Sequence, residues 1–192
     1  MDAPNPFELF DDEIDPSLRN QILRYHMSSV LSDKERARLF GLHETCRIRE
    51  HAKIIWPENL KCGDNVWIGE GAILDASGGL EIGSHTSIGL GVFIWTHSSH
   101  KQNRKMANVQ NSPDIVRKPT KIGNGVFIAG PSVVLAGTTI GDKAIISPMS
   151  LVDRDVEEGE VFSTVRNTNK DIKGLRAEIR DLTKRLDALE GN

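Results

Sequence analysis

The chain has 192 residues, a formal net charge of −3 and two cysteines. This length predicts one domain, and the weakly acidic balance argues against a nucleic-acid binder held by phosphate contacts. Cys46 and Cys62 lie 16 residues apart, which favours neither a zinc site nor a disulfide framework. We find neither a basic-then-apolar leader nor a run of 18 apolar residues, so we expect a cytoplasmic protein without an integral membrane segment.

Residues 1–43 form the first predicted region. Residues 1–16 are acidic and contain three prolines, which indicates a loosely ordered arm. A helix is expected from Pro16 to about Ser29, with Asp15 as its N-cap and proline at its first position. A second helix is expected from Ser32 to Gly41, because S-D-K-E at its start is a capping box.

Residues 44–166 are organised by a six-residue repeat. It is clearest where aliphatic residues recur six apart, at Ile122, Ile128, Val134 and Ile140. This period is neither 2 nor 3.6, so it fits neither one long strand nor one helix, and six-residue repeats are typical of β-helices. We therefore predict an all-β solenoid, a parallel β-helix whose coils are about 18 residues long.

One loop interrupts the array. Residues 96–118 are polar, basic and unrepeated, and the repeat resumes at Ile122. A long loop that breaks a regular array is more often functional than accidental. The loop carries two histidines, His97 and His100.

Residues 167–192 have a different period. Apolar residues are spaced 3, 4, 3, 4 and 3 apart, the seam of a coiled coil: Ile172, Leu175, Ile179, Leu182, Leu186 and Leu189. The segment R-L-D-A-L-E at 185–190 resembles a pattern of trimeric coiled coils. We predict a C-terminal coiled-coil helix that joins copies of the chain, the alternative being a single helix docked on its own solenoid.

The array, its histidine-bearing loop and the sequence I-G-D-K-A-I-I-S-P-M-S-L-V-D-R-D-V at 140–156 resemble the left-handed β-helix acyltransferases. The resemblance covers about residues 44–162. The most similar group is the sugar O-acetyltransferases, which act on galactosides, maltose and exopolysaccharides. The resemblance implies left-handed coils, a homotrimer with active sites between subunits, and acetyl-CoA as the co-substrate.

Acetyl transfer to a hydroxyl needs a general base, and histidine suits this role. Counting from Ile94, the resemblance favours His100 as the base, with His97 as the second candidate. It also places Glu70 one coil earlier, where relatives bind the acceptor or orient the base. Asp75 is interpreted as a corner residue. Neither cysteine lies near the loop, so we expect direct attack without an acyl-enzyme.

Other site residues follow from chemistry and from the resemblance. Trp95, beside the histidines, is a candidate acceptor contact because sugars stack on aromatic faces. The resemblance places the coenzyme along small residues on successive coils, at Ala129-Gly130 and Ser147-Pro148. The segment S-T-V-R-N-T at 163–168 departs from the family pattern, and Arg166 or Lys170 is the candidate contact with the coenzyme's phosphates. The basic loop could attract the anionic coenzyme or a nucleotide-linked sugar.

Three alternatives remain open. The first is acetylation of an antibiotic or of an amino-sugar nitrogen, as in xenobiotic acetyltransferases of the same fold. The second is a scaffold protein without chemistry. The third is a γ-type carbonic anhydrase with zinc on His85, His97 and His100, although His85 and His97 are 12 residues apart and would lie on different faces of a coil. We expect no metal.

Overall fold

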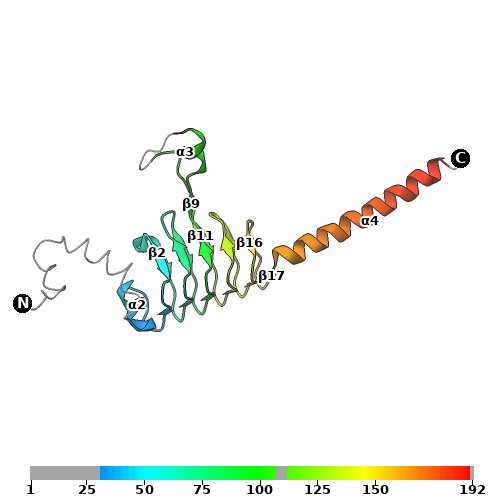
Figure 1. Cartoon of the computed structure of the whole chain (residues 1–192). Helices are drawn as coiled ribbons and strands as arrows, with labels where there is room; N and C mark the ends of the chain where they lie inside the picture. The colour runs from blue at the N-terminus through cyan, green and yellow to red at the C-terminus, as the bar shows by residue number, and fades with distance from the viewer. Residues whose placement is uncertain (1–30, 107–111, 191–192) are drawn as a thin grey trace, which may run out of the picture.

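The structure, a computed structural model, describes residues 31–106 and 112–190. Short strands coil into a solenoid, and a long helix leads away from one end of it (Figure 1). The predicted acidic arm and the helix expected at 16–29 lie outside the described residues.

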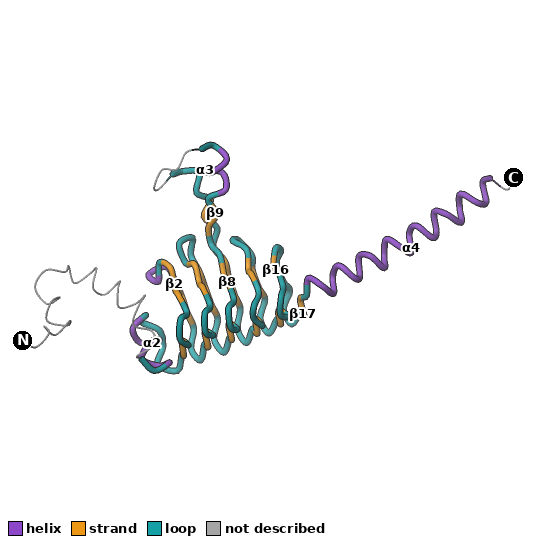
Figure 2. The backbone as a smooth tube through the Cα atoms, in the orientation of Figure 1, coloured by secondary structure: helices purple, strands orange, loops and turns teal. Residues whose placement is uncertain are grey.

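Three parallel sheets form the faces of the solenoid (Figure 2). Sheet A comprises β1 (Arg47–Ile48), β4 (Trp67–Ile68), β7 (Ser87–Ile88), β12 (Phe127–Ile128), β15 (Ile145–Ile146) and β17 (Val161–Phe162). Sheet B comprises β2 (Lys53–Ile55), β5 (Ile73–Asp75), β8 (Phe93–Ile94), β13 (Val133–Val134) and β16 (Leu151–Val152). Sheet C comprises β3 (Leu60–Cys62), β6 (Leu80–Ile82), β11 (Thr120–Ile122) and β14 (Thr139–Ile140). A 3₁₀ turn, η2 (Pro57–Asn59), precedes β3.

The predicted repeat positions fill the interior. In sheet A the strands pair in register, so that one buried column forms from Ile48, Ile68, Ile88, Ile128, Ile146 and Phe162. Sheet B adds the column Ile54, Leu74, Ile94, Val134 and Val152. Because each coil is too thin to bury its own apolar side chains, the coils are stable only when stacked. This parallel solenoid agrees with the predicted β-helix.

The interrupting loop leaves between sheets B and C of one coil. Ile82 pairs with Ile122 directly, so the 40 residues between them form one coil and the loop, not two coils. The loop contains β9 (His97–Ser98) and β10 (Val116–Arg117), which pair antiparallel. The helix α3 (His100–Arg104) lies beyond them, at the end of the projecting ribbon (Figure 1).

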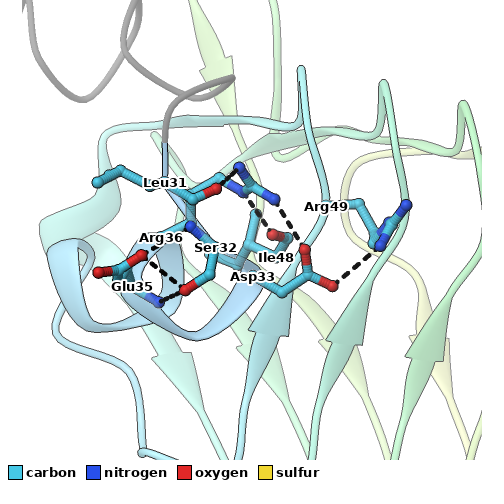
Figure 3. A network of polar contacts seen from close by, with 7 residues as sticks. All are labelled: Leu31, Ser32, Asp33, Glu35, Arg36, Ile48 and Arg49. Carbon is cyan, nitrogen blue, oxygen red and sulfur yellow. Dashed lines mark hydrogen bonds and ion pairs between the residues drawn. The ribbon is translucent and has the colours of Figure 1, made fainter.

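Helix α2 (Asp33–Leu39) covers the first coil. The predicted capping box is present, with Ser32 as N-cap and Glu35 completing it. Arg36, 3% exposed, donates from Nε to the carbonyl oxygen of Ile48 at 2.7 Å (Figure 3). Its guanidinium also donates to Asp33 at 2.8 Å. The arginine thereby satisfies a carbonyl on the terminal strand of sheet A, which has no further coil to pair with.

Helix α4 (Thr164–Glu190) follows β17 directly. Four of the predicted seam residues are exposed, Ile172 by 41%, Leu175 by 58%, Ile179 by 61% and Leu182 by 54%. The helix leads away from the solenoid, which does not match the alternative of docking on its own coils (Figure 1). The side chains of Arg166, Leu186 and Leu189 lie outside the described residues.

Replacing Arg36 with leucine should destabilise the fold by about 3 kcal/mol, because it leaves the Ile48 carbonyl and Asp33 without this donor. Urea unfolding followed by circular dichroism measures the loss. The control is Arg38→Leu, an exposed position in the same helix, which should change stability by less than about 0.5 kcal/mol. Equal losses in the two variants would show that Arg36 does not hold this end of the solenoid.

Candidate active site

The candidate site lies at the corner where the chain passes from sheet B to sheet C, which we call the B/C corner. Strand β5 ends there at Asp75, and one coil later β8 continues through Trp95 and Thr96 into the loop. The pairing of Leu74 with Ile94 brings Asp75 beside the start of the loop. Residues about 20 apart in sequence are therefore neighbours at this corner.

Asp75 is fully buried and heavily hydrogen-bonded. Its Oδ2 accepts from the backbone N–H of Thr96 at 2.8 Å and from the Thr96 hydroxyl at 3.0 Å. Its Oδ1 accepts from the Ser77 N–H at 3.0 Å. Burial raises the pKa of Asp75, but the hydrogen bonds from Thr96, His97 and Ser77 outweigh it and lower this pKa from 3.8 to about 2. The carboxylate is therefore ionised at neutral pH.

His97 is oriented by this carboxylate. Its Nδ1 lies 2.6 Å from Asp75 Oδ2, and the Ser77 hydroxyl oxygen lies 3.0 Å from the same nitrogen. An ionised carboxylate can only accept, so Nδ1 carries the proton and donates it. The other ring nitrogen, Nε2, then presents a lone pair. A half-buried imidazole in this tautomer is suited to accept a proton from a substrate hydroxyl.

His100 has a different environment. It is exposed, it begins α3, and its Nδ1 lies 2.8 Å from the Ser98 hydroxyl oxygen. Among the described residues, no carboxylate forms a hydrogen bond or ion pair with His100. The preference for His100 came from counting along the loop, whereas the contacts orient only His97.

A pocket of about 410 Å³, which we call the histidine pocket, opens beside these residues. Its lining includes Trp95, His97, His100, Val116, Lys118 and Leu135. The Trp95 ring meets the His97 ring edge-on, with centroids 6.2 Å apart. The structure thus brings together three residues predicted from the sequence, Trp95, His97 and His100.

Other predicted site residues lie at a different corner, between sheets A and B, which we call the A/B corner. The register of sheet A places Glu70, Gly130 and Pro148 at equivalent turns of their coils. Within one chain, Glu70 and the predicted coenzyme contacts Ala129-Gly130 and Ser147-Pro148 are therefore on another edge than His97. The carboxylate that contacts the imidazole is Asp75, not Glu70.

Asp75 was interpreted from sequence as a corner residue without a role in the site. Its position is indeed a corner, but its side chain turns inward to the base of the loop. Aligning the 20-residue coils, which sets Ile73-Leu74-Asp75 on Phe93-Ile94-Trp95, could have revealed that it lies beside the histidine stretch.

Gly130 is small for a packing reason. A Cβ added there would lie 1.7 Å from the carbonyl oxygen of Leu90 on the adjacent coil, an impossible approach. The close approach of the two coils therefore accounts for this glycine by itself. Ala129 and Ser147, both half-buried, flank the same corner.

The cysteines are remote from the site. Cys46 is buried, and its thiol donates to the carbonyl oxygen of Gly63 at 3.3 Å. Burial and the neighbouring Cys46 raise the pKa of Cys62 to about 12, so this thiol stays protonated at neutral pH. Neither cysteine is placed as a nucleophile for the histidine pocket.

Two features are absent from residues 31–106 and 112–190. Within these ranges, no three His, Cys, Asp or Glu residues are grouped so as to hold a metal ion, and His85 lies in the turn between β6 and β7. In the same part of the chain, no helix combines the length and apolarity needed to cross a bilayer.

Comparisons with solved structures identify the fold. A hexapeptide-repeat acetyltransferase from Vibrio cholerae superposes with a TM-score of 0.62 at 23% identity, covering 73% of this chain and 81% of that one. A maltose O-acetyltransferase from Clostridium difficile 630 gives 0.59 at 19% identity, covering 73% and 77%. The solenoid thus has the hexapeptide-repeat fold.

Sequence comparison adds one group of relatives. The chain is 29% identical over 117 residues to WcaF of Escherichia coli K12, which is named for colanic acid biosynthesis and acetyl transfer. The match covers 60% of this chain and 60% of WcaF, so the chain spans under two thirds of the curated relatives it matches. No family model matches the chain. These findings confirm the predicted resemblance to hexapeptide-repeat acetyltransferases.

The lowered pKa of Asp75 predicts how stability depends on pH. Because this pKa is about 2 in the folded chain against an ordinary 3.8, the ionised carboxylate stabilises the fold above pH 3.8. That contribution is lost as the pH falls from about 4 towards 2. Thermal unfolding between pH 5 and pH 2.5 should therefore show a steeper fall in Tm for the native chain than for Asp75→Asn. Parallel curves for the two proteins would contradict the assignment.

Proposed function

We propose that the chain transfers an acetyl group from acetyl-CoA to a hydroxyl of a sugar or sugar-containing acceptor. The observation that carries the proposal is the buried Asp75 carboxylate, 2.6 Å from Nδ1 of a half-buried histidine that lines a pocket. The comparisons support the same chemistry. A second structure of the Vibrio cholerae acetyltransferase is a complex with acetyl coenzyme A, and it has a TM-score of 0.56 to this chain.

In the proposed reaction, Nε2 of His97 accepts the proton of the acceptor hydroxyl as its oxygen attacks the thioester carbonyl carbon. A neutral alcohol is a weak nucleophile, so this proton transfer lowers the barrier. Asp75 holds the ring and stabilises the imidazolium that forms. The tetrahedral intermediate then expels the thiolate of coenzyme A, which takes up the proton from His97. No acyl-enzyme is required.

The active assembly is proposed to be a homotrimer. The outward residues of sheet A are apolar on four of its strands: Trp67, Phe127, Ile145 and Val161. Those of sheet B are apolar on four strands, at Ile73, Phe93, Val133 and Leu151, with Lys53 on the first strand. Sheet C instead presents Lys61, Glu81 and Lys121 as an ion-paired row. Two different apolar faces suit a head-to-tail contact, in which face A of one copy meets face B of the next and the ring closes.

Such a ring also brings two separate corners together. The histidine of one copy lies at its B/C corner, and the small residues at 129–130 and 147–148 lie at the A/B corner. We propose that one copy supplies Asp75 and His97 while a neighbour's A/B corner lines the coenzyme, with Arg166 near its phosphates. Glu70, at that same corner, would then reach the acceptor from the neighbouring copy, and Trp95 would contact it from the first.

The exposed seam of α4 supports the same assembly. Three heptads are marginal as an isolated coiled coil, but a solenoid ring would already hold three helices at high local concentration. We infer that the α4 helices of three copies pack along Ile172, Leu175, Ile179 and Leu182. The cytoplasmic location expected from the sequence stays a prediction.

Removing the proposed base should reduce the rate strongly. We expect His97→Asn to lower kcat by about 100-fold or more, the usual contribution of a general base. His100→Asn, the matched change three residues further along the chain, should keep kcat within about threefold of the native chain. Release of the coenzyme A thiol from acetyl-CoA, with a panel of sugars and nucleotide sugars, measures both. A larger loss in His100→Asn would assign the base to His100.

A charge in the α4 seam should weaken the trimer. Ile179→Asp places a carboxylate where three helices are proposed to meet. The protein concentration at which the trimer dissociates should therefore rise by at least about tenfold. Ala177→Asp, exposed on the same helix but off the seam, is the matched control. Sedimentation velocity over a dilution series measures the shift. The coiled coil is wrong if both variants dissociate alike.

A further inference from the structure

A second pocket lies near the base of the β9–β10 ribbon, and it shares no lining residue with the histidine pocket. It has a volume of about 480 Å³, and we call it the arginine pocket. It is lined by Glu58, Asn59, Lys61, Ser77, Gly78 and Arg117. Ser77 connects it to the proposed base, because its hydroxyl oxygen lies 3.0 Å from His97 Nδ1.

Arg117 is placed opposite His97. The two residues are paired across the antiparallel β9–β10 ribbon. The neighbouring pair is joined by a hydrogen bond from Lys118 N–H to the Thr96 carbonyl oxygen, 2.8 Å, which makes 97 and 117 a non-hydrogen-bonded pair. In such pairs the Cα atoms are about 4.5 Å apart and both side chains leave the same face of the ribbon. The Arg117 side chain, which is exposed, therefore leaves the ribbon on the same face as the imidazole.

Three of the side chains that line the pocket have no side-chain partner among the described residues. No described side chain forms a hydrogen bond or ion pair with Arg117, Glu58 or Asn59. The remaining cation, Lys61, is shared with Glu81 at 3.1 Å. The pocket thus offers a free guanidinium, an amide and a carboxylate, which is a set that binds hydroxyls and an acid group rather than an apolar chain.

We propose that the arginine pocket is an anion subsite of the acceptor site, in addition to the Trp95 and Glu70 contacts, and that the acceptor is an acidic sugar. Its carboxylate or phosphate pairs with the Arg117 guanidinium, and its ring hydroxyls bond to Asn59 and Glu58. A hydroxyl on the same ring then reaches Nε2 of His97. The assignment rests on the proposed transfer reaction for its catalytic meaning, but the anion site itself stands on the pocket and its unpaired groups.

The alternative is that Arg117 serves the donor, since coenzyme A also carries phosphates. The two sources are distinguished by which ligand loses affinity when the guanidinium is removed. A general attraction by the basic loop is a further alternative, and it would not depend on which arginine is removed. Arg104 tests this, because it lies in the same loop, is exposed and does not line the pocket.

Binding is measured first, by isothermal titration of the full chain with glucuronate, glucose 1-phosphate and neutral glucose, without donor. The native chain should bind one of the two acidic sugars at least about tenfold more tightly than glucose. Arg117→Gln should remove that advantage and leave glucose unchanged, whereas Arg104→Gln should keep it. Equal binding of all three sugars, or equal losses in the two variants, overturns the proposal.

Kinetics separates this subsite from the proposed function. Arg117→Gln should raise the KM for the acidic sugar about tenfold, with kcat and the KM for acetyl-CoA unchanged. A rise confined to the KM for acetyl-CoA would assign Arg117 to the donor and overturn the subsite. If acidic sugars bind through Arg117 and no acetyl transfer follows, the subsite stands and the transfer reaction is wrong.

Discussion

The stacking register of the parallel coils is the constraint on which the rest of the structure depends. Each strand is two or three residues long, too short to be stable alone, and it forms only because the coils above and below pair with it. The same register aligns the inward aliphatic side chains into columns. Core packing and the hydrogen bonds between coils therefore favour the same alignment. A slip by one residue would turn Ile68 or Ile88 outward and leave polar residues inside. The candidate site is held in place for the same reason, because it lies at corners whose positions the paired strands fix.

The Asp75 carboxylate shows how a corner becomes a site. It satisfies the N–H of Thr96 at the point where the chain leaves the solenoid, and the same oxygen contacts His97. A buried charge is costly unless it is well hydrogen-bonded, and here four contacts with Thr96, Ser77 and His97 offset the desolvation. One side chain therefore both anchors the loop and selects the tautomer of the imidazole. Removing it would perturb stability and chemistry together, which is why an asparagine is the more informative replacement than an alanine.

Periodicity predicted the solenoid, the extent of its core and the interrupting loop, because a six-residue repeat has few structural solutions. It also predicted the α2 capping box, which is a local signal in Ser32 and Glu35. The partner of His97 was missed for the opposite reason. Asp75 reaches the imidazole from the adjacent coil, and its inward orientation depends on the Thr96 N–H, which no local pattern reveals. Choosing between His97 and His100 likewise required knowing which ring meets a carboxylate, since both lie in the same short stretch.

The division of the candidate residues between two corners carries a mechanistic consequence. In one chain, the oriented base and the small-residue corner at Gly130 lie at opposite edges of sheet B. The proposed ring would instead bring the base of one copy to the small-residue corner of the next. Gly130 must be a glycine because a side chain at this position would clash with the carbonyl oxygen of Leu90. Packing between the coils therefore shapes this corner before any ligand binds. A rigid, preformed edge of this kind can serve a neighbouring copy without rearranging. The apolar outer faces of sheets A and B would then do two things at once, since burying them assembles the ring and also sets the distance between one copy's His97 and the next copy's A/B corner. Assembly and catalysis are coupled on this view, and dilution that separates the copies should remove activity while leaving each solenoid folded.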